Sequence, residues 1–319
     1  LLRVVLFRLD DEDQVLLLVL HHIVSDGWSM AVLLRELETL YEAFDSSQPS
    51  PLPSLPIQYA DFARWQREWL RGPVLNAQVD FWKQQLAGAP AMLELSTDKP
   101  RPAIQTYRGA YHNSRLGKEL TQSLNELSRR EGVTLFMTLV AAFQTMLHRY
   151  TNQRDILVGT PIANRTRLET EDLIGLFVNT LVVRTDFSGD PSFRELLSRV
   201  REVALDAFAH QDLPFEKLVE EIHPERSLGH MPLFQALFAL QNVPKSAWKL
   251  GSLELTDFPF DKSTSKLDLS LYVGERDDGL TLSFEYSTDL FDAETIELMA
   301  ANFQTLLEGI VANPAQRVS

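Results

Sequence analysis

The residues of this chain that are best suited to chemistry lie in one short segment, His21-His22-Ile23-Val24-Ser25-Asp26-Gly27. An imidazole exchanges protons near neutral pH, and a carboxylate can brace the loop that carries it. We predict that His22 is the reactive group, that Asp26 is a brace and not a base, and that Gly27 marks a backbone too tight for a Cβ. Metal binding also uses His and Asp, and a lone His is often purely structural, so both alternatives stay open here.

This segment is flanked by elements that can fix it in space. An apolar run at residues 15–20 predicts a buried strand, and residues 1–9 and 15–24 form a hairpin across a polar turn at residues 10–13. A helix pattern covers residues 28–44, and Ser25 or Asp26 can cap its start. A loop between a buried strand and a packed helix can hold an imidazole with one ring nitrogen open to a reactant.

The rest of the chain alternates helices and strands, which predicts an α/β fold. Prolines at positions 100 and 102 interrupt the pattern, so we predict a division into residues 1–100, which carry the histidine loop, and residues 101–319. Helices are predicted at residues 59–70, 75–86, 118–130, 134–150, 192–208, from 215 onward and at 292–311, and strands at residues 155–160, from 177 onward and at 233–240, 266–273 and 280–286.

Composition excludes several classes of function. The formal net charge is −14, with 44 acidic against 30 basic residues, which argues against a nucleic-acid groove. No apolar run approaches the roughly 20 residues that a membrane span needs. The absence of cysteine removes thiolate chemistry and fits a reducing cytoplasm. We therefore expect a cytoplasmic protein that binds neither nucleic acid nor membrane.

Five segments in order resemble the signatures of the condensation domain of nonribosomal peptide synthetases, in the chloramphenicol-acetyltransferase-like superfamily. They are residues 21–29, 59–65, 174–184 and 210–216, and, as a looser match, residues 225–227 with 232–234. The family's first two signatures, which precede the histidine loop, are absent. The resemblance implies a two-lobed chloramphenicol-acetyltransferase-like fold with mixed sheets covered by helices and a truncated N-terminal lobe. The truncation would leave one sheet edge bare, and whether such a fragment is active stays open at this point.

The resemblance also implies a reaction and partners. Donor and acceptor peptidyl carrier domains deliver phosphopantetheine thioesters to a tunnel between the lobes, beside an adenylation domain, and the acceptor amine attacks the donor thioester. No cofactor or metal is expected on this chain itself. His22 faces the tunnel, where it takes the amine's proton or positions the amine, and Gly27 offers its N–H to the oxyanion.

Further residues receive roles from the same resemblance. His21 supports the loop, and Asp26 pairs with an arginine of the other lobe, for which Arg165 is the first choice and Arg184 the second. Three residues are predicted to line the tunnel: Asn242, Trp28 and Ser29. Alternatives are an epimerisation domain, a stand-alone thioester-dependent acyltransferase and an inactive carrier-docking fragment.

Overall fold

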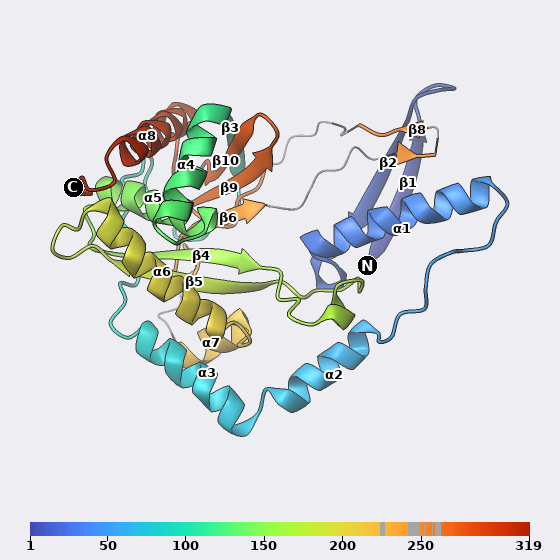
Figure 1. Cartoon of the computed structure of the whole chain (residues 1–319), viewed down its shortest axis with the longest axis horizontal. Helices are drawn as coiled ribbons and strands as arrows, with labels where there is room; N and C mark the ends of the chain where they lie inside the picture. Colours follow the sequence, from blue (N-terminus) through green and yellow to red (C-terminus); the bar gives the residue numbers. More distant parts are fainter. Residues whose placement is uncertain (224–226, 242–248, 252, 257, 259–262) are drawn as a thin grey trace. The chain divides into compact units, whose positions relative to one another are not determined.

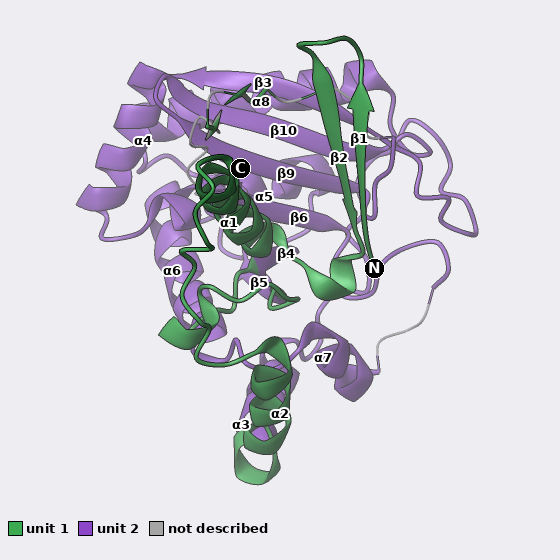
Figure 2. Cartoon of the chain, turned by 90° about the vertical axis from the view of Figure 1, so that its right-hand side faces the viewer, with its two compact units in different colours: residues 1–74, 162–179, 243–260 green, residues 75–161, 180–242, 261–319 purple. Residues whose placement is uncertain are grey.

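The computed structural model describes residues 1–223, 227–241, 249–251, 253–256, 258 and 263–319. Figure 1 follows the chain from the N-terminal hairpin to the last helix. The chain separates into two compact units, coloured in Figure 2, and each is described by itself. Unit 1 comprises residues 1–74, 162–179 and 243–260, and unit 2 comprises residues 75–161, 180–242 and 261–319.

Unit 1 carries the histidine loop between a hairpin and a helix, as predicted. Strands β1 (Leu2–Arg8) and β2 (Gln14–Leu20) are antiparallel, a 3-10 turn covers His22–Val24, and helix α1 runs over Gly27–Asp45. Helix α2 (Tyr59–Trp69) follows. A second 3-10 turn, Leu168–Thr170, and two short strands, β7 (Lys249–Leu250) and β8 (Leu253–Glu254), complete the unit.

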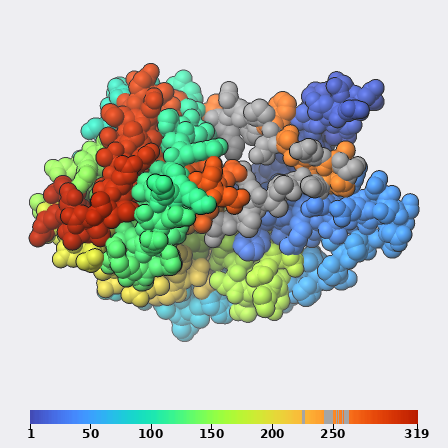
Figure 3. All heavy atoms as spheres, turned by 45° about the horizontal axis from the view of Figure 1, so that its top comes forward, coloured from blue at the N-terminus to red at the C-terminus, as the bar shows by residue number. Residues whose placement is uncertain are grey.

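The hairpin differs from its prediction in burial. Leu16, Leu17 and Val19 of β2 are 38%, 43% and 49% exposed, so the expectation of a buried strand is wrong for the described chain. A two-stranded sheet has two open faces, and no other described strand pairs with this one. Its side chains, dark blue in Figure 3, are visible at the surface. The loop therefore depends on contacts beyond its strand for its position.

Unit 2 is built on a six-stranded mixed sheet in the order β3-β10-β9-β6-β4-β5. The strands are β3 (Gly109–Gly117), β4 (Asp155–Ile162), β5 (Asn179–Asp186), β6 (Ala236–Gln241), β9 (Leu269–Arg276) and β10 (Gly279–Ser287). The helices are α3 (Gly72–Gln85, whose first turn belongs to unit 1), α4 (Lys118–Arg130), α5 (Leu135–Thr151), α6 (Phe193–Ala209), α7 (Phe215–Ile222) and α8 (Ala293–Ala312).

The core of unit 2 lies on one face of this sheet. Helices α4, α5 and α8 pack on strands of the sheet and on one another, as Figure 1 also shows. Phe238 of β6 and Phe284 of β10 meet Phe143 of α5 and Phe303 of α8, with ring centroids 6.0 to 6.4 Å apart. Since side chains alternate across a strand, the neighbouring residues of β9 and β10 form a second, polar face.

Most element predictions are confirmed, with helix ends displaced by a few residues, and helix α4 has the predicted bounds. Strand β3 was missed. Strand β5 begins at Asn179 and not at Phe177, because the backbone N–H groups of Phe177 and Val178 bind a side chain of unit 1. The predicted division between residues 100 and 101 concerns the lobes of the fold. The two units are defined by contacts and do not test this division, which stays a prediction.

Candidate active site

The loop orients both histidines through hydrogen bonds to backbone groups. His21 caps the 3-10 turn, because its Nδ1 accepts from the N–H of Ile23 at 3.1 Å. The Nδ1 of His22 lies 2.8 Å from the carbonyl oxygen of Ser25. A carbonyl can only accept, so this nitrogen carries the proton and the neutral ring has its lone pair at Nε2. His22 is exposed, and Nε2 forms no hydrogen bond to another described residue.

Asp26 anchors the loop through hydrogen bonds to backbone N–H groups. Its residue is 4% exposed, and its Oδ1 accepts from the N–H of Ser29 at 2.8 Å, which caps α1. Its Oδ2 accepts from the N–H groups of Phe177 and Val178 at 2.9 and 3.2 Å. A carboxylate that accepts three backbone N–H groups is a brace, and it ties the loop to a segment about 150 residues further along the chain.

Arg165 completes this buried centre. Its Nη2 lies 3.4 Å from Asp26 Oδ1 and donates to Ser29 Oγ at 2.8 Å, while its Nη1 donates to the carbonyl oxygens of Thr170 and Leu173. The Arg165 and Asp26 side chains are 1% and 3% exposed. The guanidinium also lies 4.0 Å from the ring centroid of Phe177. Its planar fork of donors, which lysine lacks, joins the loop to the turn at residues 168–170.

Electrostatics favour the charged carboxylate. Burial alone would raise the pKa of Asp26, but the hydrogen bonds from Ser29 and Phe177 and the charge of Arg165 outweigh it and hold this pKa below its ordinary value of 3.8. Asp26 is therefore ionised at neutral pH and is unsuited to act as an acid.

Two further signatures of the sequence, in helix α2 and around Gly175, position the backbone that Asp26 binds. The ring of Tyr59 in α2 packs over Gly175, where a Cβ would meet ring carbon at 2.2 Å, and its hydroxyl donates to the carbonyl oxygen of Leu176 at 2.8 Å. Phe62 and Phe177 pack against each other nearby, with tilted rings whose centroids are 4.7 Å apart. The aromatic helix and the segment around Gly175 thus hold the N–H groups that Asp26 binds.

The remaining loop residues differ in their exposure. Gly27 is the exposed first residue of α1, and a Cβ there would meet nothing within 4 Å, so the expectation of a tight backbone is wrong. Its N–H forms no hydrogen bond to a described residue and lies at the positive end of the helix dipole. Trp28 is 39% exposed and donates to the carbonyl oxygen of Glu171. Ser29 is 0% exposed, bonded to Gly175, and has no surface to line a tunnel.

The structure also places the other predicted residues. Arg165, the first choice, pairs with Asp26, so this pairing is found in the structure. Arg184 lies in unit 2 and binds Asp155, with Nη2 2.7 Å from Oδ2. Asn242 lies outside the described residues. The sequence analysis did not identify Ser29 or the N–H of Phe177 as anchors of the loop. For Ser29 the one available signal was a polar side chain in the first turn of α1. For the N–H of Phe177 there was none.

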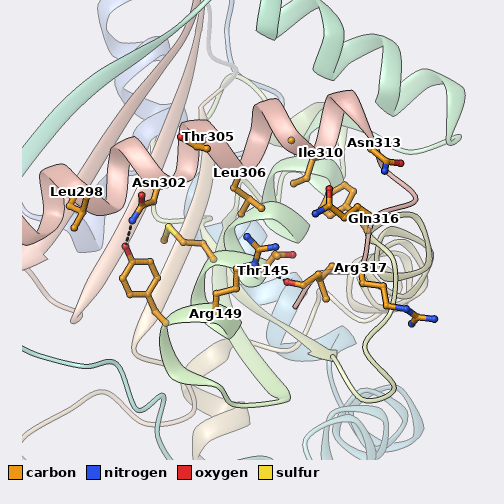
Figure 4. A pocket seen from close by; sticks show the side chains of 15 residues that line it. Thr145, Arg149, Leu298, Asn302, Thr305, Leu306, Ile310, Asn313, Gln316 and Arg317 are labelled. Carbon is orange, nitrogen blue, oxygen red and sulfur yellow. Dashed lines mark hydrogen bonds between the residues drawn. The ribbon is translucent and has the colours of Figure 1, made fainter.

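Other kinds of site find little support in the part of the chain that the structure describes. No group of three His, Asp or Glu side chains is placed to hold a metal ion. No described helix is long and apolar enough to cross a membrane. A cavity of about 570 Å³ lies between α5 and α8 of unit 2 (Figure 4), but no histidine or acidic side chain lines it. There Asn302 donates to the hydroxyl of Tyr150, and Arg149 donates to the carbonyl oxygen of Val318.

An exposed imidazole of fixed tautomer, on a loop held by a buried ion pair, suits an enzyme that manages protons in acyl transfer. A family model described as "Condensation domain" matches residues 1–319, and the chain belongs to that family. Condensation domains of nonribosomal peptide synthetases are acyl-transferring enzymes that form amide bonds. The resemblance inferred from five segments is therefore confirmed.

Relatives and solved structures agree with this assignment. The chain is 56% identical over 321 residues to one of the linear gramicidin synthase subunits of Brevibacillus parabrevis, with all of the chain aligned. It is 42% identical over 316 residues, 98% of the chain, to phosphinothricin tripeptide synthetase PhsC of Streptomyces viridochromogenes. The chain spans 6% of the length of the first relative and 29% of the second.

Among solved structures, the X-domain from teicoplanin biosynthesis matches 99% of this chain at a TM-score of 0.91 and 31% identity. The SgcC5 protein from Streptomyces globisporus matches 99% at a TM-score of 0.81 and 33% identity. In both cases the match covers 73% of the other chain. The predicted α/β class, with a mixed sheet covered by helices, is confirmed.

Proposed function

We propose that this domain forms a peptide bond between two carrier-bound thioesters. The observation that carries the proposal is the His22 ring, whose Nδ1 is fixed on Ser25 and whose Nε2 is exposed. An acceptor amine that attacks a thioester carbonyl must lose a proton as its C–N bond forms. A lone pair at Nε2 can accept the N–H of that amine and then its proton, while the ring keeps its bond to Ser25.

The helix that follows His22 supplies the second requirement of acyl transfer. The tetrahedral intermediate carries an oxyanion, and free N–H groups at a helix N-terminus stabilise developing negative charge. Gly27 N–H is such a group, because it is the first residue of the 19-residue helix α1 and has no described acceptor. When the C–S bond breaks, the leaving thiolate takes the proton back from Nε2, so the imidazole is regenerated.

We propose donor and acceptor carrier domains as partners that deliver both substrates as phosphopantetheine thioesters, with an adenylation domain beside them and the assembly in the cytoplasm. Two linear gramicidin synthase subunits, each over half identical to this chain in the aligned region, support this context. The chain itself then needs no bound cofactor, because the reactive thioester arrives on a carrier.

The test replaces His22 by Ala in a synthetase that contains this domain and measures product formation between loaded donor and acceptor carriers. Loss of the ring should lower the rate by about 10²- to 10⁴-fold. Thermal stability should hardly change, because the ring is exposed and makes one hydrogen bond to Ser25.

His21→Asn is the matched control. Asn can accept the N–H of Ile23 in place of the imidazole Nδ1, so this variant should keep most of its activity. Unchanged transfer in His22→Ala would refute the proposal and favour a module that docks carriers without chemistry. Release of an epimerised donor in place of an elongated product would identify the epimerisation alternative.

A further inference from the structure

The cavity between α5 and α8 has the size and the inner surface of a site for a small organic ligand. Its volume is about 570 Å³, and all of its lining residues belong to unit 2. The deepest of them are apolar, since Met146, Phe193, Ile310 and Val318 are at most 5% exposed. Figure 4 shows Leu306 of α8 and Arg149 of α5 on opposite walls of this space. Pockets of a few hundred Å³ with a mostly apolar lining are typical of small-molecule sites.

The charged side chains that line the cavity are both basic. They are Arg149 and Arg317, and no acidic side chain lines it, although the whole chain has 44 acidic against 30 basic residues. Arg317 donates to the carbonyl oxygen of Asp190. Arg149 donates from Nε to the carbonyl oxygen of Val318 at 2.8 Å, and its Nη1 donates to no described residue. Since a guanidinium binds carboxylates strongly, the lining is complementary to an anionic head group next to Arg149.

Helix α8 leaves room for a ligand at Gly309. This glycine lines the cavity, and a Cβ built there would meet no atom within 4 Å. Glycine lowers the stability of a helix relative to other residues. Neither a close approach nor a left-handed backbone requires glycine at this position. The absent side chain therefore weakens α8 and keeps part of the cavity open.

We propose that this cavity binds a small amphipathic carboxylate. The carboxylate pairs with the guanidinium of Arg149, and the apolar part of the ligand lies along Met146, Leu306 and Ile310, beside the open space at Gly309. The site uses residues of unit 2 alone, and it does not depend on the chemistry assigned to His22.

The experiment measures binding to the full chain by isothermal titration calorimetry with three probes. Octanoate supplies the apolar chain and the charge, octanamide has a chain of the same length without the charge, and acetate has the charge without the long chain. The wild-type protein should bind octanoate at least about tenfold more tightly than either of the others, because only octanoate satisfies both the guanidinium and the apolar surface.

Gly309→Leu is the variant that fills the cavity. It should weaken octanoate binding by at least about tenfold, because the new side chain occupies space that the ligand needs. Its urea midpoint should not fall, because leucine favours a helix more than glycine does. Ala301→Leu is the matched control, since it adds a leucine to an exposed position of α8 that does not line the cavity, and it should bind octanoate as the wild type does.

Arg149→Gln tests the head group separately. It should reduce octanoate binding to about the level of octanamide, because it removes the charge that distinguishes the two probes. Arg201→Gln is its control, because Arg201 is an exposed residue of α6 outside the cavity and the change also removes one positive charge. Circular dichroism verifies that these variants are folded.

Three results would overturn the proposal. Equal binding of octanoate and octanamide by the wild type would show that the cavity does not select a carboxylate. Unchanged octanoate affinity in Gly309→Leu would show that the ligand binds elsewhere. No binding of octanoate by the wild type would favour a macromolecular partner on this surface. Because the readout is binding, none of these results depends on amide-forming activity.

Discussion

Replacing Asp26 by Ala should destabilise unit 1 strongly. The change removes the partner of Arg165, whose side chain is 1% exposed, and the acceptor of the backbone N–H groups of Ser29, Phe177 and Val178. Breaking a buried ion pair by removing one partner costs about 3–5 kcal/mol, and the loss of a helix cap alone costs about 1 kcal/mol. We expect a total near the upper part of this range, of about 4–5 kcal/mol.

Urea unfolding followed by tryptophan fluorescence can measure this effect. Trp28, Trp65 and Trp69 lie in unit 1, and the Trp28 indole is 5.9 Å from the guanidinium carbon of Arg165. Domains of this size lose about 1–3 kcal/mol per molar urea, so the transition of unit 1 should move down by at least about 1 M. The transition of unit 2 should move less, because the substituted side chain and its partners belong to unit 1.

Asp172→Asn provides the control for removing a carboxylate from an ion pair. Asp172 pairs with Arg35 at 2.6 Å, but both side chains are about 60% exposed, and exposed pairs contribute at most about 1 kcal/mol. Adding Arg165→Met to Asp26→Ala should recover part of the loss, because it removes the uncompensated charge. An effect of Asp26→Ala no larger than that of Asp172→Asn would show that the buried pair does not hold the loop.

Three other changes test the same centre. Folding lowers the pKa of Asp26 below 3.8, so the stability that the carboxylate adds is present above pH 3.8. This stability is lost as the pH falls through the lower pKa of the folded state. The difference in unfolding free energy between wild type and Asp26→Asn, measured in urea, should therefore shrink in that acid range. Gly175→Ala should lower stability by about 1–3 kcal/mol in the same assay, because its Cβ would lie 2.2 Å from the Tyr59 ring. Gly27→Ala, where a Cβ meets nothing within 4 Å, should change stability by no more than about 0.5 kcal/mol, and a large loss would refute the described geometry.

Local patterns in the sequence predicted the elements that carry strong periodicity. The amphipathic spacing of residues 118–130 predicted the bounds of helix α4, and the strand-loop-helix context of the histidines is as expected. Strand β3 was missed because Tyr111, Asn113 and Arg115 occupy one face while His112 and Ser114 share the other with apolar residues. Polar residues on both faces erase the alternation that identifies a strand.

Contacts between distant segments could be predicted only in part. Arg165 was a reasonable partner for Asp26, because an acidic brace needs a cation and this arginine follows a strand. The N–H donors of Phe177 and Val178 carry no side-chain signal, so the sequence holds no sign that they bind Asp26. The exposure of β2 was also unpredictable, since an apolar run has the same composition whether or not another element covers it.

The two ends of the histidine loop differ in burial and in hydrogen bonding. Asp26 is buried and bonded to groups of two other segments, so its replacement should lower stability and activity together. The ring of His22, four residues earlier, is exposed, and among the described residues it bonds only to Ser25 of the same loop, so its replacement should lower activity alone. A loop that merely filled space would show the first pattern at both positions. The ratio of the activity loss to the stability loss at His22, compared with that at Asp26, therefore distinguishes a chemical role from a structural one.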